Sequence, residues 1–179
     1  MTPTDAHGEA AKTVDPTKVR VPRSPAVAAW IALLVGLASA CVSAYWGFGG
    51  ERLLDTVGGA FERLGRSGTG GAVVLLSIVV VVKVIAAVLP MLAIRPVGTS
   101  PTRRLIRRLA WVEAFILTGY GLVYTAGGLL IEADVIKTPP DADSYAMAWH
   151  TYLWDPWFLV WGSLVTVALL HSRSSVSTK

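Results

Sequence analysis

The sequence predicts an all-α membrane protein, a four-helix transmembrane bundle with both ends of the chain in the cytoplasm. Of its 179 residues 53% are hydrophobic and only 16% are charged, a balance too apolar for a typical soluble domain. The apolar residues gather in four blocks of about 20 residues, the length that a helix needs to cross about 30 Å of hydrocarbon. The basic residues are distributed unequally between the two sides of these blocks, and this asymmetry predicts the orientation.

The four predicted spans follow one another with short connections. They cover residues 25–48, 71–94, 109–131 and 152–171. Together they form one predicted transmembrane domain, residues 25–171, between a disordered cytoplasmic tail, 1–24, and a second cytoplasmic tail, 172–179. Valines dominate the second block, and valine favours strands in water. In lipid, however, an open strand leaves backbone groups unpaired, so we expect a helix.

The orientation follows from the lysines and arginines in the loops and tails. One side carries eleven of the 16 basic residues: Lys12, Lys18, Arg20, Arg23, Arg95, Arg103, Arg104, Arg107, Arg108, Arg173 and Lys179. The other side carries four: Arg52, Arg63, Arg66 and Lys137. Cytoplasmic loops are enriched in basic residues, so the first side is predicted to be cytoplasmic. The formal net charge of +4 therefore reflects topology and does not indicate a nucleic-acid partner.

The first outer loop, between the first two spans, has its own periodicity. Its apolar residues lie at helical spacing: Leu53, Leu54, Val57, Phe61 and Leu64. Glycines at both ends release the chain from the flanking spans. We expect a short amphipathic helix that lies on the outer membrane surface or caps the bundle.

Small residues recur at every fourth position of the first span, at Ala28, Ala32, Gly36, Ala40 and Ala44. Such a face lets a neighbouring helix approach closely. The neighbour could be another helix of the same bundle or a second copy of the chain in a homodimer. We favour packing within the bundle, because no further motif marks a dimer interface.

Four polar residues within the spans form a candidate intramembrane site: Lys83, Glu113, Tyr120 and Tyr124. Lys83 lies near the middle of the second span, where a cation needs a partner or water. The second and third spans are antiparallel and joined by a short loop, so we expect Lys83 to pair with Glu113. Tyr120 and Tyr124 share a helix face with Glu113. The group is either a structural ion pair with tyrosines that set the helix register, or a proton or substrate site.

Aromatic residues gather at the outer ends of the first and fourth spans. The candidate residues of an outer aromatic pocket are Tyr45, Trp46, His150, Trp154, Asp155 and Trp157. We favour an aromatic belt at the lipid headgroups, where tryptophan and tyrosine gather in most membrane proteins. The alternative is a pocket in which His150 and Asp155 orient a lipid or small amphiphile. One His with one Asp does not indicate a metal site.

No sequence motif names a reaction or a cofactor. The glycine pairs lack the strand and helix context of a phosphate-binding loop, and no nucleophile elbow or zinc motif is present. The single cysteine, Cys41, cannot form an intramolecular disulfide. The sequence thus indicates no catalytic residue, no metal, no cofactor and no enzymatic activity.

Two segments carry a resemblance to a known family. They are AYWGFGG at residues 44–50, followed by LDTVG at 54–58, and WDPWFLVWG at 154–162. They resemble the paired motifs of an uncharacterised bacterial membrane family known as domain of unknown function 3995, over about residues 30–170. Members often carry a His just before the first motif, where this chain has Ser43 and Ala44. The resemblance implies four spans and no established activity.

Two functional hypotheses follow. The first is a binding or accessory component of the cytoplasmic membrane, in contact with the lipid bilayer and with a lipid, a small amphiphile, a second copy or another membrane protein. The alternative is a small secondary transporter that uses the Lys83 and Glu113 pair. Small four-span cation exporters carry their essential acid in the first helix, and the first span here has none.

Overall fold

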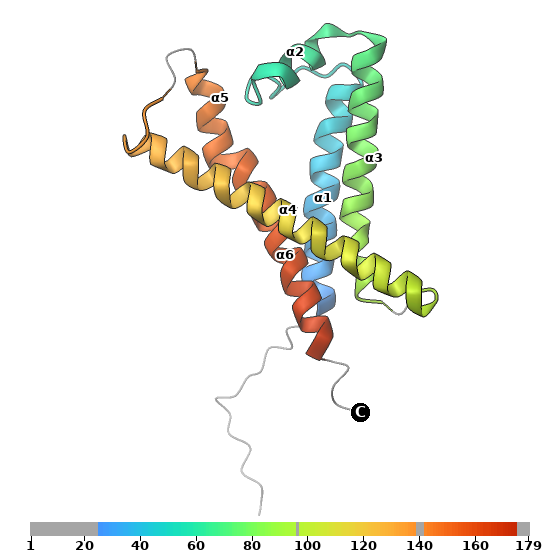
Figure 1. Cartoon of the computed structure of the whole chain (residues 1–179). Helices are drawn as coiled ribbons and strands as arrows, with labels where there is room; N and C mark the ends of the chain where they lie inside the picture. Colours follow the sequence, from blue (N-terminus) through green and yellow to red (C-terminus); the bar gives the residue numbers. More distant parts are fainter. Residues whose placement is uncertain (1–24, 96, 139–141, 175–179) are drawn as a thin grey trace, which may run out of the picture.

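The computed structural model describes residues 25–95, 97–138 and 142–174 (Figure 1). Of these residues 82% are helical and none lies in a strand. The chain is therefore all-α, as predicted. The predicted tail 1–24 and most of the predicted tail 172–179 lie outside the described residues.

Seven helical segments follow one another along the described chain. They are α1 (Pro25–Gly47), α2 (Gly59–Ser67), α3 (Gly70–Ala93), α4 (Ser100–Glu132), α5 (Ser144–Trp149), the π-helical turn η1 (His150–Trp154) and α6 (Asp155–Ser174). Four helices are long and apolar enough to cross a membrane: α1, α3, α4 and the continuous stretch Ser144–Ser172. This confirms four spanning helices by length and composition.

Two of the four helices begin several residues before the predicted spans. α4 begins at Ser100, ahead of the expected 109, because Thr99 and a proline in its first turn start the helix and the arginines that follow are good helix formers. The fourth begins at Ser144, ahead of the expected 152. There the Asp143 carboxylate accepts hydrogen bonds from the backbone N–H groups of Tyr145 (3.0 Å) and Ala146 (3.1 Å).

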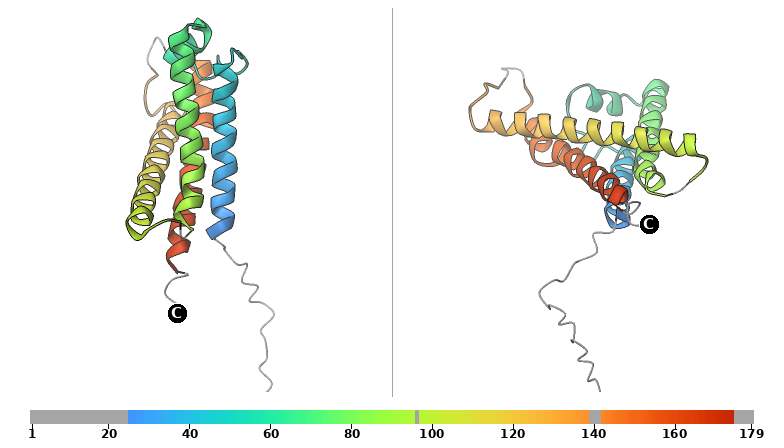
Figure 2. Two further views of the ribbon diagram at one scale, coloured as in Figure 1. Left: turned by 90° about the vertical axis from the view of Figure 1, so that its right-hand side faces the viewer. Right: turned by 60° about the horizontal axis from the view of Figure 1, so that its bottom comes forward.

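Consecutive spanning helices pack closely, except that α3 and α4 have little contact. α1 packs against α3 and α6, and α4 packs mainly against α6 while it crosses the other helices obliquely (Figures 1 and 2). Arg107 of α4 reinforces this contact, since its guanidinium donates to Leu169 O at 2.9 Å and Ser172 Oγ at 3.0 Å near the end of α6. α3 and α4 are thus in less contact than the short loop between them predicts.

The small-residue face of α1 is buried within the chain. Ala28, Ala32, Gly36 and Ala40 are all buried, and Ala32 belongs to a core cluster that includes Ala87 of α3 and Trp161 of α6. At Gly36 an added Cβ would lie 2.5 Å from Trp161 Cζ2 and 2.7 Å from Ala87 Cβ. The face from Ala28 to Ala40 is therefore covered by helices of the same chain, whereas Ala44 is half-buried.

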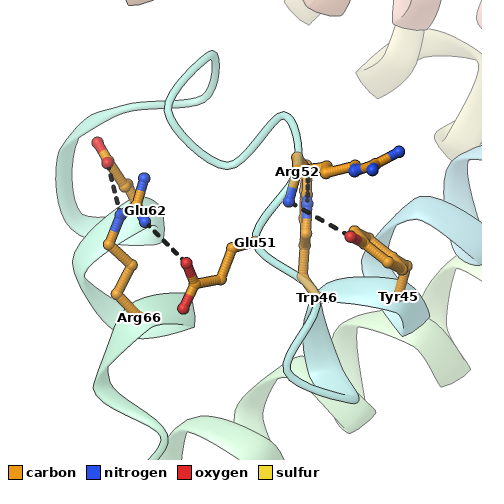
Figure 3. Close-up of polar contacts among 6 residues, drawn as sticks. All are labelled: Tyr45, Trp46, Glu51, Arg52, Glu62 and Arg66. Carbon is orange, nitrogen blue, oxygen red and sulfur yellow. Dashed lines mark hydrogen bonds and ion pairs between the residues drawn. The ribbon is translucent and has the colours of Figure 1, made fainter.

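Polar contacts fasten the segment between α1 and α3 to the end of α1 and to itself (Figure 3). The Trp46 indole donates to Arg52 O at 3.0 Å, and the Arg52 N–H donates to the Tyr45 hydroxyl at 3.4 Å. Arg66 of α2 forms ion pairs with Glu62 (2.9 Å) and Glu51 (3.4 Å). The hydrogen bond to Glu62 raises the pKa of the Arg66 guanidinium above its usual value.

The helix in this segment is shorter than the apolar spacing predicts. Leu53, Leu54 and Val57 lie in turns, and α2 contains only the last part of the predicted helix. The break follows from Gly58 and Gly59, which both have φ of 62°, a left-handed backbone that ends a helix. The position of α2 relative to a membrane stays a prediction.

Candidate functional site

A half-open cavity of about 220 Å³ lies at the end of the helices that carries α2. It is lined by residues of α1, α3, α4, α6, η1 and the α1–α3 segment: Ser39, Val42, Ser43, Trp46, Val57, Phe61, Val79, Lys83, Tyr120, His150, Trp154, Trp157 and Phe158. Six of these belong to the two candidate sites predicted from the sequence. The structure therefore brings parts of both sites into one cavity, which sequence reasoning kept separate.

Lys83 lies at the deep end of this cavity. It is 13 residues from the first residue of α3, which at the rise of a helix is about 20 Å. Its ammonium donates to Ser43 Oγ at 2.8 Å and, more weakly, to Ser39 O at 3.5 Å. It also lies 5.7 Å from the centre of the Phe158 ring, within range of a cation–π contact. All three partners are uncharged, although a cation at mid-membrane costs about 2.5–3.5 kcal/mol by insertion scales.

The expected pair between Lys83 and Glu113 is not formed. Lys83 binds α1 instead, and both carboxylate oxygens of Glu113 are buried without a hydrogen-bond partner among the described residues. Glu113 does not line the cavity either. The physical reason is the oblique course of α4, whose main partner is α6 and not the preceding helix α3.

The two tyrosines of the predicted intramembrane site differ in their surroundings. Their rings are in contact, with centroids 4.5 Å apart. Tyr120 packs its ring against the edge of Phe158 at 5.5 Å and lines the cavity. Tyr124 is 55% exposed and does not line it. The shared face expected for these residues exists, but only Tyr120 reaches the cavity.

The π-helical turn η1 places two side chains of the cavity wall. It covers His150–Trp154, and both its first and its last residue line the cavity. A π turn inserts one extra residue into a helix and rotates the side chains that follow, and such turns are frequent at functional sites. The sequence contains no feature from which we predicted this turn.

His150 connects α6 to the α1–α3 segment. Its Nδ1 lies 3.2 Å from Asp155 Oδ1 and its Nε2 lies 3.1 Å from Val57 O. Both partners are acceptors, so only the protonated ring, with a hydrogen on each nitrogen, makes both hydrogen bonds. Asp155 is 3% exposed and lies behind His150, outside the cavity lining.

A second hydrogen bond fastens the same segment. The Trp154 indole donates to Thr56 Oγ1 at 3.1 Å, and Thr56 is itself buried. The segment that carries Thr56 and Val57 thus forms a roof over the cavity, which His150 and Trp154 hold from the opposite side. Thr56 was not among the site residues predicted from the sequence. Its position in the LDTVG segment, close to the aromatic motif, was the feature that could have indicated it.

The aromatic residues near this end fall into two groups. Trp46 is buried and meets Trp154 edge to face at 5.7 Å, while the Trp157 indole donates to Val35 O at 3.3 Å. Tyr45 and Tyr152 are exposed at 44% and 62%. The exposed tyrosines fit an aromatic belt, whereas the inward tryptophans form the walls of a cavity.

The lining limits the chemistry of the cavity. It combines aromatic and aliphatic walls with the Lys83 ammonium, the Tyr120 hydroxyl, the His150 imidazole and two serines. Within the described part of the chain no three His, Cys, Asp or Glu side chains gather as a metal site would require. The arrangement suits recognition of a molecule that is mostly apolar and has one polar end.

Comparison with known proteins places most of the chain in one family. The family model described as "Protein of unknown function (DUF3995)" matches residues 34–165. No curated protein and no solved structure matches the chain. The matched region contains every residue that lines the cavity.

Proposed function

The chain belongs to the DUF3995 family of unknown function, and we propose that it is a membrane-embedded binding protein whose cavity takes a small amphiphile. The observation that carries the proposal is the convergence of Lys83 with the inward tryptophans in one cavity. A simple aromatic belt would leave the tryptophans facing lipid. Lys83 has no carboxylate partner among the described residues, so its charge is left for a bound molecule to balance.

The charge distribution supports an orientation for this protein in the cytoplasmic membrane. The loop that precedes α4, together with the first turns of α4, holds Arg95, Arg103 and Arg104, and it lies at the end of the helices opposite to α2 (Figure 1). With this basic end in the cytoplasm, both termini are cytoplasmic and the cavity opens in the outer half of the bilayer. An amphiphile would then reach Lys83 from the outer side.

The transport hypothesis loses its geometric basis. It needs Lys83 and Glu113 to face a common path, whereas Lys83 lines the cavity and Glu113 does not. An accessory role is compatible with the proposed binding function. The protein would then bind the ligand in its cavity and either respond to it or deliver it to another membrane protein.

The experiment uses two variants of one helix. Val79→Trp fills the cavity, because Val79 lines it, and Val81→Trp is the matched control, because Val81 is 57% exposed on the same helix. Full-length protein is extracted from its membrane into lipid nanodiscs, and small molecules bound to it are analysed by native mass spectrometry. We expect wild type and Val81→Trp to carry a bound molecule and Val79→Trp to lose it.

Thermal unfolding of the three proteins checks that each is folded. The proposal is wrong if folded wild type carries no small molecule, or if folded Val79→Trp carries as much as wild type.

A further inference from the structure

We infer that the cavity selects a small apolar carboxylate, whose anionic group binds Lys83 Nζ while its apolar body lies among the aromatic side chains. The inference rests on the proposed function and names the chemical class of its ligand. It is drawn from the donors of Lys83, the charges around the cavity and the size of the cavity.

The Lys83 ammonium has one donor to offer. An ammonium carries three N–H groups, and two of them are used by Ser43 Oγ and Ser39 O. The third has no acceptor among the described residues. Because Lys83 lines the cavity, an acceptor on a bound molecule can take this hydrogen bond.

The charge balance of the lining favours an anion. Among the described residues no Asp or Glu lines the cavity, so no lining carboxylate competes with a bound one for Lys83. Asp155 lies outside the lining and is bound to the His150 imidazole. Electrostatic attraction is strong where water is excluded, so even one uncompensated cation discriminates between anionic and neutral ligands.

A single charge on the ligand fits better than a double one. Lys83 supplies one positive charge, and the charge of a protonated His150 is balanced by Asp155. Among the described residues no arginine lines the cavity to form the two parallel hydrogen bonds typical of phosphate recognition. A phosphate monoester would bring nearly two negative charges. One of them would be left without a partner at membrane depth, whereas a carboxylate is neutralised by Lys83 alone.

The size of the cavity sets the body of the ligand. Its volume of about 220 Å³ exceeds the roughly 150 Å³ of an apolar cavity that holds benzene. The space therefore accommodates a carboxylate on one aromatic ring or on a short alkyl chain. A fatty acid from the membrane and a free aromatic acid share this chemistry, and a longer chain would extend through the open side.

Calorimetric titration of the full-length protein in lipid nanodiscs tests the inference with a matched pair of probes. Octanoate and octanamide have the same chain and differ in charge, and empty nanodiscs correct for partition into lipid. We expect wild type to bind octanoate about 10-fold more tightly than octanamide, the typical effect of one charge-assisted hydrogen bond.

Lys83→Met keeps the length of the side chain and removes its charge. We expect this variant to bind both probes with the affinity that wild type shows for octanamide. Lys137→Met is the control, because Lys137 is an exposed lysine outside the cavity, and it should keep the preference of wild type. Thermal unfolding verifies that both variants are folded.

The possible failures are distinguishable. The inference is overturned if wild type binds the two probes with equal affinity, or if Lys83→Met still prefers octanoate. In either case the proposed function stands if Val79→Trp still abolishes binding of the probes. Binding of neither probe overturns the inference alone if native mass spectrometry still finds a molecule bound to wild type, and overturns both if it finds none. In further titrations, tighter binding of palmitate than of benzoate supports a membrane fatty acid as the carboxylate, and the reverse order supports a free aromatic acid.

Discussion

Replacement of Gly36 by alanine tests the packing on which the cavity depends. The added Cβ would lie 2.5 Å from Trp161 Cζ2 and 2.7 Å from Ala87 Cβ, whereas carbon atoms pack favourably at about 3.5–4.0 Å. Ala87 and Trp161 are 0% and 1% exposed, so neither has space to move aside. α1 must therefore shift away from α3 and α6 by several tenths of an ångström or more.

Overpacking of a buried site costs about 1–3 kcal/mol, and the better helix propensity of alanine returns up to about 1 kcal/mol. We expect Gly36→Ala to lower the free energy of unfolding by about 1–2 kcal/mol. The assay is unfolding of the protein in mixed micelles by increasing fractions of a denaturing detergent, followed by tryptophan fluorescence.

Gly119→Ala is the matched control. Gly119 also lies inside a helix, α4, but an added Cβ there meets no atom within 4 Å. Without a clash, only the propensity term of about 0.5–1 kcal/mol remains, and it should stabilise the protein. If Gly36→Ala proves as stable as Gly119→Ala, the close contact between α1, α3 and α6 is refuted.

Two further predictions concern the roof and the orientation. His150→Phe keeps a ring and removes the hydrogen bonds to Asp155 and Val57. Because one hydrogen bond contributes about 1 kcal/mol, amide hydrogen exchange of residues 51–58 should become about 5-fold faster or more. Unchanged exchange would contradict the role of His150. Alkaline phosphatase fused in the α1–α3 segment or in the α4–α5 connection should be active, and a fusion in the α3–α4 loop should not be; the opposite pattern would reverse the proposed orientation.

The spanning helices could be predicted because their cause is local. Twenty consecutive apolar residues leave the chain no alternative to a helix in hydrocarbon, so the sequence indicated four helices before any packing was known. Their starting points were less accurate. The N-terminal hydrogen bonds to Asp143 and the helix-forming arginines of α4 extend both helices beyond their apolar parts.

The small contact between α3 and α4 could not be predicted in the same way, because helix packing depends on contacts between distant segments. The expected partnership of Lys83 with Glu113 relied on the short loop between their helices. The actual course of α4 is set by its close approach to α6, where a Cβ added at Gly162 would lie 2.5 Å from the Thr118 N. Small residues in α4 and α6 were visible in the sequence, but many other pairings could have used them.

The candidate site was predicted in pieces for the same reason. The residues of each piece were recognisable as a buried cation and an aromatic cluster, and both are unusual enough within a span to be noticed. Their union depends on η1, since a regular helix through residues 150–154 would direct His150 and Trp154 differently. One extra residue in a helical turn thus connects two features that appear unrelated in the sequence.

The floor and the roof of the cavity differ in how they are held, and this difference determines how a ligand would enter. Phe158 lies on the floor and stacks on Trp161, which is locked in the core between α1 and α3. The roof is attached to η1 by hydrogen bonds from His150 and Trp154. Opening the roof breaks a few hydrogen bonds, whereas opening the floor would separate packed helices. We therefore expect the ligand to enter and leave through the roof. His150→Phe should then increase both the association rate and the dissociation rate of octanoate. The dissociation constant should change by a smaller factor than either rate.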